Sequence, residues 1–436
     1  MKMKTVLTDN VTVRDGELYF GEHSCCELAK KYGTPLYLMD SGRIRRSCRE
    51  YVDAINESFG EGSMAIYASK AASFKHIYEI VGREGMGADV VSCGEIYTAL
   101  KAGFPMERAF FQGNNKTDED IRFAINSGVG YFVCDNAEEV EAIDTIAGEM
   151  GVTQKILLRL TPGIDPHTYA AVATGRVDSK FGTAIETGQA EEITLLALSK
   201  RNIALMGFHC HVGSMVFESS TFIRSAEIML EFIADMRTKH GYAAKILDLG
   251  GGYGVRYVES QPKMSISENI KAVAQFIEEK CHELGIKRPD IIFEPGRSIV
   301  AEAGMTLYTA GTVKKIPGYK NYVSVDGGMT DNPRYALYQS LYTVVTANKP
   351  EPEETIRCDL VGRCCESGDI IQPGVDFPAD IRRGDIVAVL TTGAYNYSMA
   401  SNYNRIPRPP VVMLDGAEDY VAVKRESFED LVRNDI

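Results

Sequence analysis

The sequence predicts an α/β protein built from a (β/α)8 barrel and a C-terminal β domain, and three observations support this. Eight short apolar runs alternate with helical patterns over roughly 230 residues, which is typical of such a barrel. After about residue 304 the helical patterns give way to β-rich, turn-punctuated runs. The length of 436 residues accommodates both parts. A doubly wound open sheet would show the same alternation, but the count of eight favours the barrel.

The N-terminal piece differs from the chain that follows it. Residues 11–20 hold two short β runs around Asp15-Gly16, a pair that favours a tight hairpin turn. Ser24 and Glu27 then match the capping pattern at the start of a helix. The hairpin has no partner in the helical layer, so we expect it to join the β domain. The expected domains are 1–36 (N-terminal hairpin and helix joining the β domain), 37–303 (cofactor-binding barrel) and 304–436 (β domain).

The barrel strands are expected where buried apolar runs are bounded by small or polar residues. Capping pairs that begin at Ser92, Thr117 and Ser265 start the intervening helices. The eight expected strands are 64–68, 88–91, 109–112, 130–133, 156–160, 204–208, 245–249 and 291–293. The expected β runs of the C-terminal domain are 305–313, 321–325, 356–361, 386–391 and 418–423.

The net charge and the cysteine content limit the partners, metal sites and cellular compartments that we expect. The net charge of −13 makes a general attraction to nucleic acid or to anionic membranes unfavourable, so we expect neither partner. The ten cysteines include no CxxC pair, which argues against structural zinc, and scattered thiols favour a reducing compartment. We read no signal peptide and no apolar run long enough to span a bilayer. These features predict a cytoplasmic protein.

Charged and glycine-rich residues lie at the C-terminal ends of the predicted strands, where barrels place their active sites. The residues concerned are Lys70, Asp89, Arg159, His209, His211, Ser214, the run Gly250, Gly251 and Gly252, Glu294 and Arg297.

Each of these features also has a plain structural explanation. A lysine after a strand is usually solvated, and a glycine run is often a turn without a ligand. A buried Glu294 needs a cationic partner, either an arginine such as Arg297 or the protonated ring nitrogen of a cofactor. The two histidines have no well-spaced third ligand, so we predict no metal. Together, an imine-forming lysine, a phosphate cradle, a carboxylate and a stacking imidazole favour pyridoxal 5′-phosphate.

Seven motifs then carry a resemblance over essentially the whole chain. The sequence resembles the fold type III (alanine-racemase fold) pyridoxal-phosphate-dependent decarboxylases. The motifs are YASK ending at Lys70, HVGS at 211–214, GGG at 250–252, EPGR at 294–297, DNPRYALY at 331–338, CESGD at 365–369 and AYNYSM at 394–399.

The resemblance implies a role for each cofactor-binding position. Lys70 would be the Schiff-base lysine, with Asp89 beside it and the catalytic His211 stacked on the cofactor ring. Glu294 would pair with the pyridine nitrogen. The phosphate ligands implied are Ser214, Gly250, Gly251, Gly252 and Tyr395.

The resemblance also implies the substrate and its ligands. The reaction would be decarboxylation of meso-2,6-diaminopimelate to L-lysine and CO2, the last step of lysine biosynthesis. Arg297, Arg334 and Tyr338 would hold the distal carboxylate. Cys365 and Glu366 would reach in from the partner subunit of a homodimer, as a candidate acid and as a ligand of the distal amino group. Either Lys70 or Cys365 would protonate the α-carbon.

Some alternatives stay open at this point. Decarboxylases of ornithine, arginine or carboxynorspermidine with the same fold are alternatives, but Arg297, Arg334 and Glu366 favour a substrate with a second amino-acid-like end, since two arginines imply a distal carboxylate. A racemase should lack the CESGD motif, and a non-catalytic relative should have lost the lysine, the cysteine or the phosphate loop. The chain departs from the common family form at Ala72, which follows Lys70-Ala71, and at Tyr335, which follows Arg334. Tyr335 could narrow the pocket.

Overall fold

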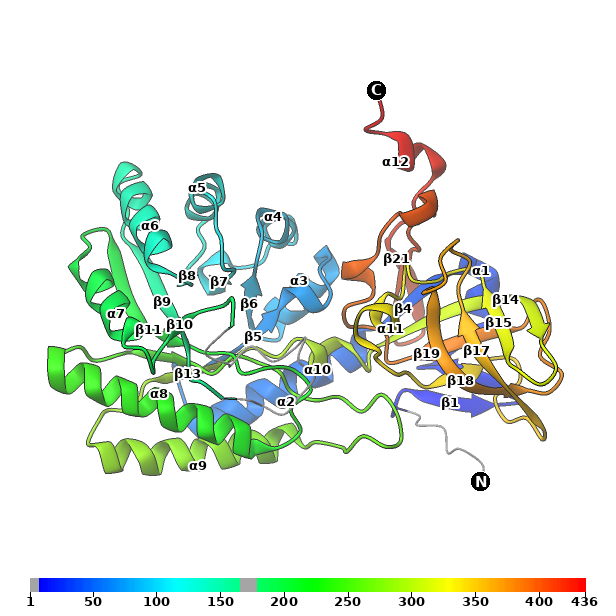
Figure 1. The fold of residues 1–436 in the computed structure, drawn as a ribbon, viewed down its shortest axis with the longest axis horizontal. Helices are drawn as coiled ribbons and strands as arrows, with labels where there is room; N and C mark the ends of the chain where they lie inside the picture. Colours follow the sequence, from blue (N-terminus) through cyan, green and yellow to red (C-terminus); the bar gives the residue numbers. More distant parts are fainter. Residues whose placement is uncertain (1–7, 165–178) are drawn as a thin grey trace. The chain divides into compact units, whose positions relative to one another are not determined.

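The computed structural model describes residues 8–164 and 179–436 of the chain. The chain divides into two compact units (Figure 1). The barrel unit comprises Ser47–Val255 and Lys263–Ser298, and the β unit comprises Met1–Arg46, Arg256–Pro262 and Ile299–Ile436.

Eight parallel strands of the barrel unit form a closed barrel. Neighbouring strands pair in the order β9-β11-β12-β13-β5-β6-β7-β8, and β8 pairs back with β9 to close the ring. This confirms the predicted (β/α)8 barrel. The strands are β5 (Met64–Ala68), β6 (Gly87–Val90), β7 (Ala109–Phe111), β8 (Tyr131–Cys134), β9 (Gln154–Thr161), β11 (Ile203–His209), β12 (Ile246–Asp248) and β13 (Asp290–Phe293); the short β10 (Thr183–Ala184) adds to β9.

Helices surround these strands (Figure 1). Ser92, Thr117 and Ser265 each accept a hydrogen bond from the backbone N–H three residues on, as the capping patterns predict. The helices are α2 (Ser41–Phe59), which begins in the β unit, α3 (Lys75–Arg83), α4 (Cys93–Lys101), α5 (Asp118–Asn126), α6 (Ala137–Glu149), α7 (Gln189–Ser199), α8 (Ser219–His240) and α9 (Ile266–Leu284), with 3-10 turns η1 (Ser69–Ala71) and η2 (Met106–Arg108).

Apolar side chains fill the inside of the barrel. One core cluster takes a single residue from each of six strands, and all six are buried to at least nine-tenths. Because these apolar side chains fill the inside of the barrel, the polar chemistry is left to the strand ends. The cluster consists of Ile66, Phe110, Val133, Leu157, Ile246 and Ile292.

The β unit is organised around a nine-stranded mixed sheet. Its main path runs β18-β17-β15-β14-β4-β20-β21, and β19 joins β14 to β16. The strands are β4 (Leu36–Asp40), β14 (Gly304–Lys315), β15 (Asn321–Val325), β16 (Val344–Thr346), β17 (Thr355–Val361), β18 (Ile370–Pro378), β19 (Ile386–Leu390), β20 (Val411–Asp415) and β21 (Glu418–Val423). Helix α10 (Arg297–Val300) begins in the barrel unit and ends in the β unit, and the short helical segments of the β unit are α11 (Arg334–Tyr338), η4 (Tyr397–Met399), η5 (Tyr403–Arg405) and α12 (Phe428–Val432).

Both ends of the chain build the β unit, as predicted. The N-terminal strands β1 (Val11–Arg14), β2 (Glu17–Phe20) and β3 (His23–Ser24) form a small sheet before α1 (Cys25–Tyr32). Strand β4 lies in the large sheet, antiparallel to β14 and parallel to β20. Leu18 and Phe20 of the hairpin pack in one core with Leu307 and Val412. The C-terminal β domain therefore takes in the N-terminal strands.

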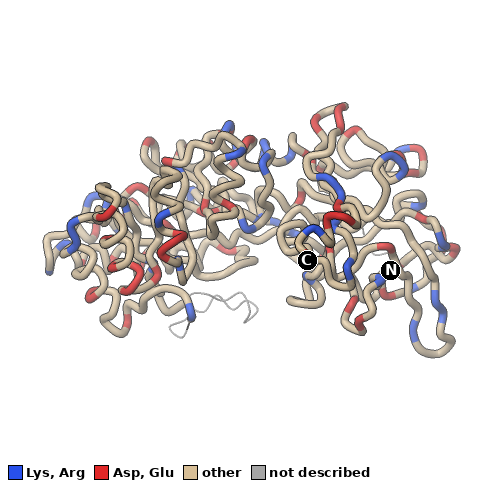
Figure 2. The backbone as a smooth tube through the Cα atoms, turned by 90° about the horizontal axis from the view of Figure 1, so that it is seen from above, with Lys and Arg blue, Asp and Glu red and all other residues tan. Residues whose placement is uncertain are grey.

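Charged residues of both signs are interspersed in both units (Figure 2). Within the described residues, no helix combines the length and the apolar character that crossing a membrane requires.

Candidate active site

The C-terminal ends of the barrel strands carry a ring of polar side chains, as the sequence predicts. Parallel pairing sets several of them level with one another: His209 on β11 is in register with Arg159 on β9 and with Asp248 on β12. The ring is made of Lys70 after β5, Asp89 in β6, Gln112 after β7, Arg159 in β9, His209 in β11, Asp248 in β12 and Glu294 after β13.

Glu294 accepts hydrogen bonds from two other members of this ring, one at each of its carboxylate oxygens. The Gln112 side-chain amide donates to Oε1, and His209 Nε2 lies 3.3 Å from Oε2. All three side chains are buried. Glu294 is therefore bound by a neutral amide and an imidazole, whereas the arginine considered from the sequence, Arg297, hydrogen-bonds Ser214 instead.

The surroundings of Glu294 keep its carboxylate ionised. Burial alone would raise its pKa, but the imidazole of His209 and the positive charge of Lys70 outweigh the burial and lower the pKa to about 2. Burial lowers the pKa of His209 in turn. A hydrogen bond from His209 Nε2–H to Oε2 favours the Glu294 carboxylate whether the imidazole is neutral or protonated, so His209 serves as a hydrogen-bond donor to this anion.

Asp89 is the second buried carboxyl group and lies beside the predicted Schiff-base lysine. Its Oδ2 is 3.9 Å from Lys70 Nζ. Burial and the negative charge of Glu294 raise the pKa of Asp89 to about 8, against the opposing charge of Lys70. The Asp89 side chain is 1% exposed whereas that of Lys70 is 46% exposed, so the lysine amine remains accessible to a ligand.

Asp248 is the third buried carboxyl group. Its Oδ1 accepts the Gly250 N–H at 2.8 Å, and burial and Glu294 raise its pKa well above the usual value. Oxygen and nitrogen atoms of His209, Asp248 and Glu294 lie within 4.8 Å of one another, a spacing that could hold a metal ion. His209 and Glu294 hydrogen-bond each other, and Asp248 accepts a hydrogen bond from Gly250 of the glycine run. The three side chains therefore form part of a polar network in this structure.

The glycine run after β12 is packed so closely that side chains are excluded. A Cβ on Gly251 would lie 2.0 Å from the Glu294 carbonyl oxygen, and one on Gly252 would lie 2.1 Å from that of Gly213. Gly250 (φ +69°) and Gly252 (φ +107°) adopt backbone conformations that favour glycine. His211 Nδ1 accepts the Gly251 N–H at 3.2 Å, so the loop and this histidine are joined.

The remaining predicted residues fall into two groups. In the barrel unit, Arg297 Nη2 donates to Ser214 Oγ at 3.0 Å, which brings a predicted substrate ligand against a predicted phosphate ligand. In the β unit, the buried Arg334 guanidinium lies 5.4 Å from the ring centre of Tyr338 and 5.3 Å from that of Tyr395.

Cys365 and Glu366 lie on an exposed loop of the β unit. The Cys365 N–H donates to Asn404 Oδ1 at 2.8 Å, and Glu366 Oε1 accepts the Gly368 N–H at 3.2 Å. Both residues are exposed at the surface of the unit. Among the described residues, neither side chain hydrogen-bonds Arg334.

The barrel residues fit a pyridoxal phosphate cofactor. A buried, ionised Glu294 matches a cationic ring nitrogen, and Lys70 offers an accessible amine. Asp89 Oδ1 is a buried acceptor without a hydrogen-bond partner within the described chain. In the same part of the structure, the N–H groups of Gly252 and Tyr253 have no acceptor among the described residues, which leaves donors for a phosphate.

Comparisons with known proteins agree with this geometry. A family model, the pyridoxal-binding domain of pyridoxal-dependent decarboxylases, matches residues 41–301. The diaminopimelate decarboxylase of Bacillus subtilis (strain 168) is 42% identical over 97% of this chain and 95% of its own length. This chain belongs to the diaminopimelate decarboxylase family. Its cofactor is therefore pyridoxal 5′-phosphate. The diaminopimelate decarboxylase of Staphylococcus aureus (strain COL) is 41% identical over 97% of this chain and 98% of its own length.

Solved structures of this family share the architecture. The diaminopimelate decarboxylase from M. jannaschii in complex with L-lysine has a TM-score of 0.91 and 31% identity, with 99% of both chains covered. The enzyme from Helicobacter pylori complexed with L-lysine has a TM-score of 0.83 and 33% identity, covering 93% of this chain and 98% of that one.

Sequence reasoning missed Gln112. It is uncharged and sits between an apolar run and a Gly-Asn-Asn turn, so nothing in its residue type marks it. The signal that could have found Gln112 is its position. Gln112 directly follows β7, and the other barrel strands carry their site residues at the same end. His209 and Asp248 were noted in the sequence without a role, and their burial against Glu294 supplies one.

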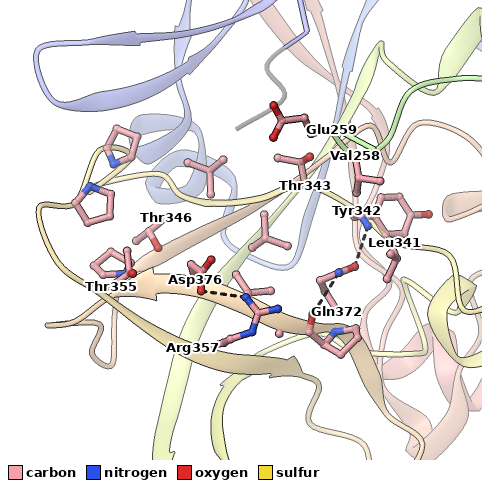
Figure 3. Close-up of a pocket in the computed structure, with 18 of the residues that line it drawn as sticks. Val258, Glu259, Leu341, Tyr342, Thr343, Thr346, Thr355, Arg357, Gln372 and Asp376 are labelled. Atoms are coloured by element: carbon pink, nitrogen blue, oxygen red, sulfur yellow. Dashed lines mark hydrogen bonds and ion pairs between the residues drawn. The ribbon is translucent and has the colours of Figure 1, made fainter. Parts of the chain in front are cut away.

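A separate pocket of about 1320 Å³ lies within the β unit (Figure 3). Its wall includes Arg357, paired with Asp376 at 3.2 Å, and Gln372, whose side-chain oxygen accepts the Tyr342 N–H at 2.8 Å (Figure 3). The described lining contains none of the predicted site residues.

Proposed function

We propose that this protein decarboxylates meso-2,6-diaminopimelate to L-lysine and CO2, as the last step of lysine biosynthesis, with pyridoxal 5′-phosphate as its cofactor. The observation that carries the proposal is identity of 41–42% over at least 94% of the chain to four bacterial proteins named diaminopimelate decarboxylase. The ionised Glu294 in the mouth of the barrel supports the same chemistry.

When bound, pyridoxal phosphate supplies an electron sink for the electrons left on the α-carbon as CO2 departs. Lys70 holds the cofactor through Nζ, and Asp89 stays beside that amine. Glu294 favours a proton on the ring nitrogen, because an anion fixed nearby stabilises the positive charge. His211, held neutral because burial and the charge of Lys70 lower its pKa, offers a flat face to the ring.

The phosphate ligands are proposed to be Ser214, Gly250, Gly251, Gly252 and Tyr395. The N–H groups of Gly250 and Gly251 donate to Asp248 and His211, whereas the Gly252 N–H has no acceptor among the described residues. Backbone N–H groups suit this task because they donate without competing side-chain charge. Tyr395 takes a left-handed backbone conformation (φ +62°), an uncommon state for a tyrosine that is found where geometry is tightly set.

The substrate ligands are proposed to be Arg297, Arg334 and Tyr338 for the distal carboxylate and Glu366 for the distal amino group. Arginine suits a carboxylate because its guanidinium donates two parallel hydrogen bonds. Holding the far end of the substrate selects which bond at the α-carbon is oriented for cleavage. Lys70 Nζ or Cys365 Sγ returns the proton to the α-carbon.

We also propose a homodimer in which Cys365 and Glu366 complete the site of the partner subunit. Their exposure on a β-unit loop supports this role. Mixing Lys70→Ala chains with Cys365→Ala chains should restore part of the activity, because each hybrid dimer holds one site with both residues. Lack of restoration after proven subunit exchange would refute the shared site. The ten free cysteines fit a cytoplasmic location.

Release of CO2 from a panel of amino acids tests the substrate. The purified holoenzyme is assayed with meso-2,6-diaminopimelate, L-lysine, L-ornithine and L-arginine, with the Lys70→Ala variant as the blank. The proposal predicts release from meso-2,6-diaminopimelate at a kcat/KM at least a hundredfold above the other three. Release from ornithine or arginine with none from diaminopimelate would assign the protein to the alternative decarboxylase activities.

A further inference from the structure

Gln112 is a member of the polar ring that has no role in the reaction described above. Its side chain is 4% exposed, and its backbone N–H donates to the Val90 carbonyl at 2.8 Å, which extends the β6–β7 pairing by one residue. The position of its backbone is therefore set by the barrel itself. From there the amide reaches across the barrel mouth to Glu294 Oε1.

We propose that Gln112 is a positioning residue for Glu294: its side-chain amide donates to Oε1 and holds the carboxylate in the orientation and charge state that the ring nitrogen of the cofactor requires. This inference rests on the proposed function only through that cofactor contact. His209 holds the other oxygen, so the two donors fix the carboxylate plane from both sides.

The chemistry of the amide explains why this donor is useful. A glutamine amide has no ionisation near neutral pH, so it stabilises the anion without adding charge and without taking up a proton. A hydrogen bond to a charged acceptor is about twice as strong as one between neutral groups. The loss of this bond would leave a buried carboxylate oxygen without a donor, which favours the protonated, ineffective form of Glu294.

Three substitutions separate positioning from mere packing. Gln112→Glu keeps the size and removes the obligatory donor, Gln112→Leu removes all hydrogen bonding, and Gln112→His restores an N–H donor. The matched control is Gln154→Leu, the same change at a buried glutamine. Within the described part of the chain, Gln154 Nε2 donates only to backbone carbonyls, of which the closest are Gly130 O and Lys155 O at 3.2 Å.

The expected kinetic result is a split between kcat and KM. Gln112→Leu should lower kcat by about tenfold to a hundredfold, the equivalent of one lost hydrogen bond to a charge, with KM changed less than threefold. Gln112→His should stay within about fivefold of the parent, because one N–H donor to a buried anion supplies most of that hydrogen bond. Gln112→Leu within twofold of the parent would overturn the proposal.

The pH profile supplies the signature that a structural role would not produce. In Gln112→Glu, the introduced carboxyl group can donate to Glu294 while it is protonated, whereas its ionised form repels Glu294. This variant should therefore lose activity as pH rises through the pKa of the introduced group. A parent-like pH profile of this isosteric variant would contradict the proposal. The charged and titratable groups that interact electrostatically with Glu294 are Lys70, Asp89, Arg159, His209, Cys210, His211 and Asp248.

The absorbance of bound pyridoxal phosphate gives a readout that needs no substrate. Its pH-dependent band should shift in Gln112→Leu and Gln112→Glu but not in Gln154→Leu, and the affinity of the apoprotein for pyridoxal phosphate should fall in the first two. Unchanged spectra and affinity would overturn the inference even if decarboxylation fails for another reason. If the parent enzyme releases no CO2 but the Gln112 variants still show these spectral shifts, the result refutes the proposed function and leaves the role of Gln112 supported. Thermal melts of each apoprotein identify a variant that fails to fold.

Discussion

Replacing Glu294 by glutamine removes one negative charge from the barrel mouth while keeping the side-chain shape. The pKa of Glu294 is lowered from 4.5 to about 2, so its surroundings favour the anion by about 3 kcal/mol relative to water. Glutamine cannot carry that charge. Its single oxygen can accept from Gln112 or from His209, so one of the two buried donors loses its acceptor.

The loss of activity follows from the role of the anion beside the cofactor ring nitrogen. Removing one fixed electrostatic partner from a catalytic site typically costs about 10²–10³ in kcat, so Glu294→Gln should lower kcat by about a hundredfold. Phosphate anchoring does not involve Glu294, so the variant should still bind pyridoxal phosphate. Steady-state CO2 release at saturating substrate and cofactor measures kcat, and the absorbance of the bound cofactor confirms loading.

A second variant at the same position separates the effect of charge from the effect of side-chain geometry. Glu294→Asp keeps the charge but shortens the side chain by one methylene, so it should lose less activity than Glu294→Gln. A Glu294→Gln enzyme that is fully loaded and has a kcat within threefold of the parent would refute the electrostatic role. Equal losses in both variants would assign the effect to geometry instead of charge.

The remaining predictions concern neighbouring positions. Lys70→Ala should abolish the visible absorbance of covalently held cofactor, and a retained band would refute the assignment of this lysine. Asp89→Asn should raise Tm, and more at pH 8 than at pH 5: burial raises the pKa of Asp89 to about 8, so its cost to the folded state grows with pH above the unfolded value near 4. Equal gains in Tm at the two pH values would contradict this. Gly251→Ala should lose cofactor retention after gel filtration, because its Cβ would meet the Glu294 carbonyl at 2.0 Å, whereas Gly94→Ala, with the nearest atom at 3.6 Å, should retain it.

The barrel could be predicted from the sequence because its strands are buried on both faces and read as continuous apolar runs. The strand Met64–Ala68 coincides with the predicted 64–68, and the hairpin turn at Asp15-Gly16 has positive φ at both residues, as that turn requires. The helix starts at Ser92 and Ser265 were also found, since a capping hydroxyl is a local signal.

Strand β18 was missed because Pro373 and Gly374 interrupt its apolar pattern. The structure tolerates both because β18 is the terminal strand of its sheet path and pairs along one side with β17. Such tolerance depends on where a strand lies in the sheet, which is a long-range property. Local patterns carry no information about it.

Some residues of the candidate site could be predicted from the sequence, and others could not. Charged residues that end strands, such as Lys70 and Glu294, are visible in the sequence because their chemistry is distinctive. The partners of Glu294 are not visible: Gln112 and His209 come from strands 182 and 85 residues away along the chain. A neutral glutamine acquires its role only through the closed barrel that brings it across from β13.

The stoichiometry of the products formed from meso-2,6-diaminopimelate tests the proposed decarboxylation directly. Purified enzyme with pyridoxal phosphate is incubated with the substrate, and CO2 and L-lysine are quantified together by gas capture and chiral chromatography. The proposed reaction yields one L-lysine for each CO2, and the Lys70→Ala variant should form neither product. Release of CO2 without L-lysine, or consumption of the substrate without CO2, would contradict it.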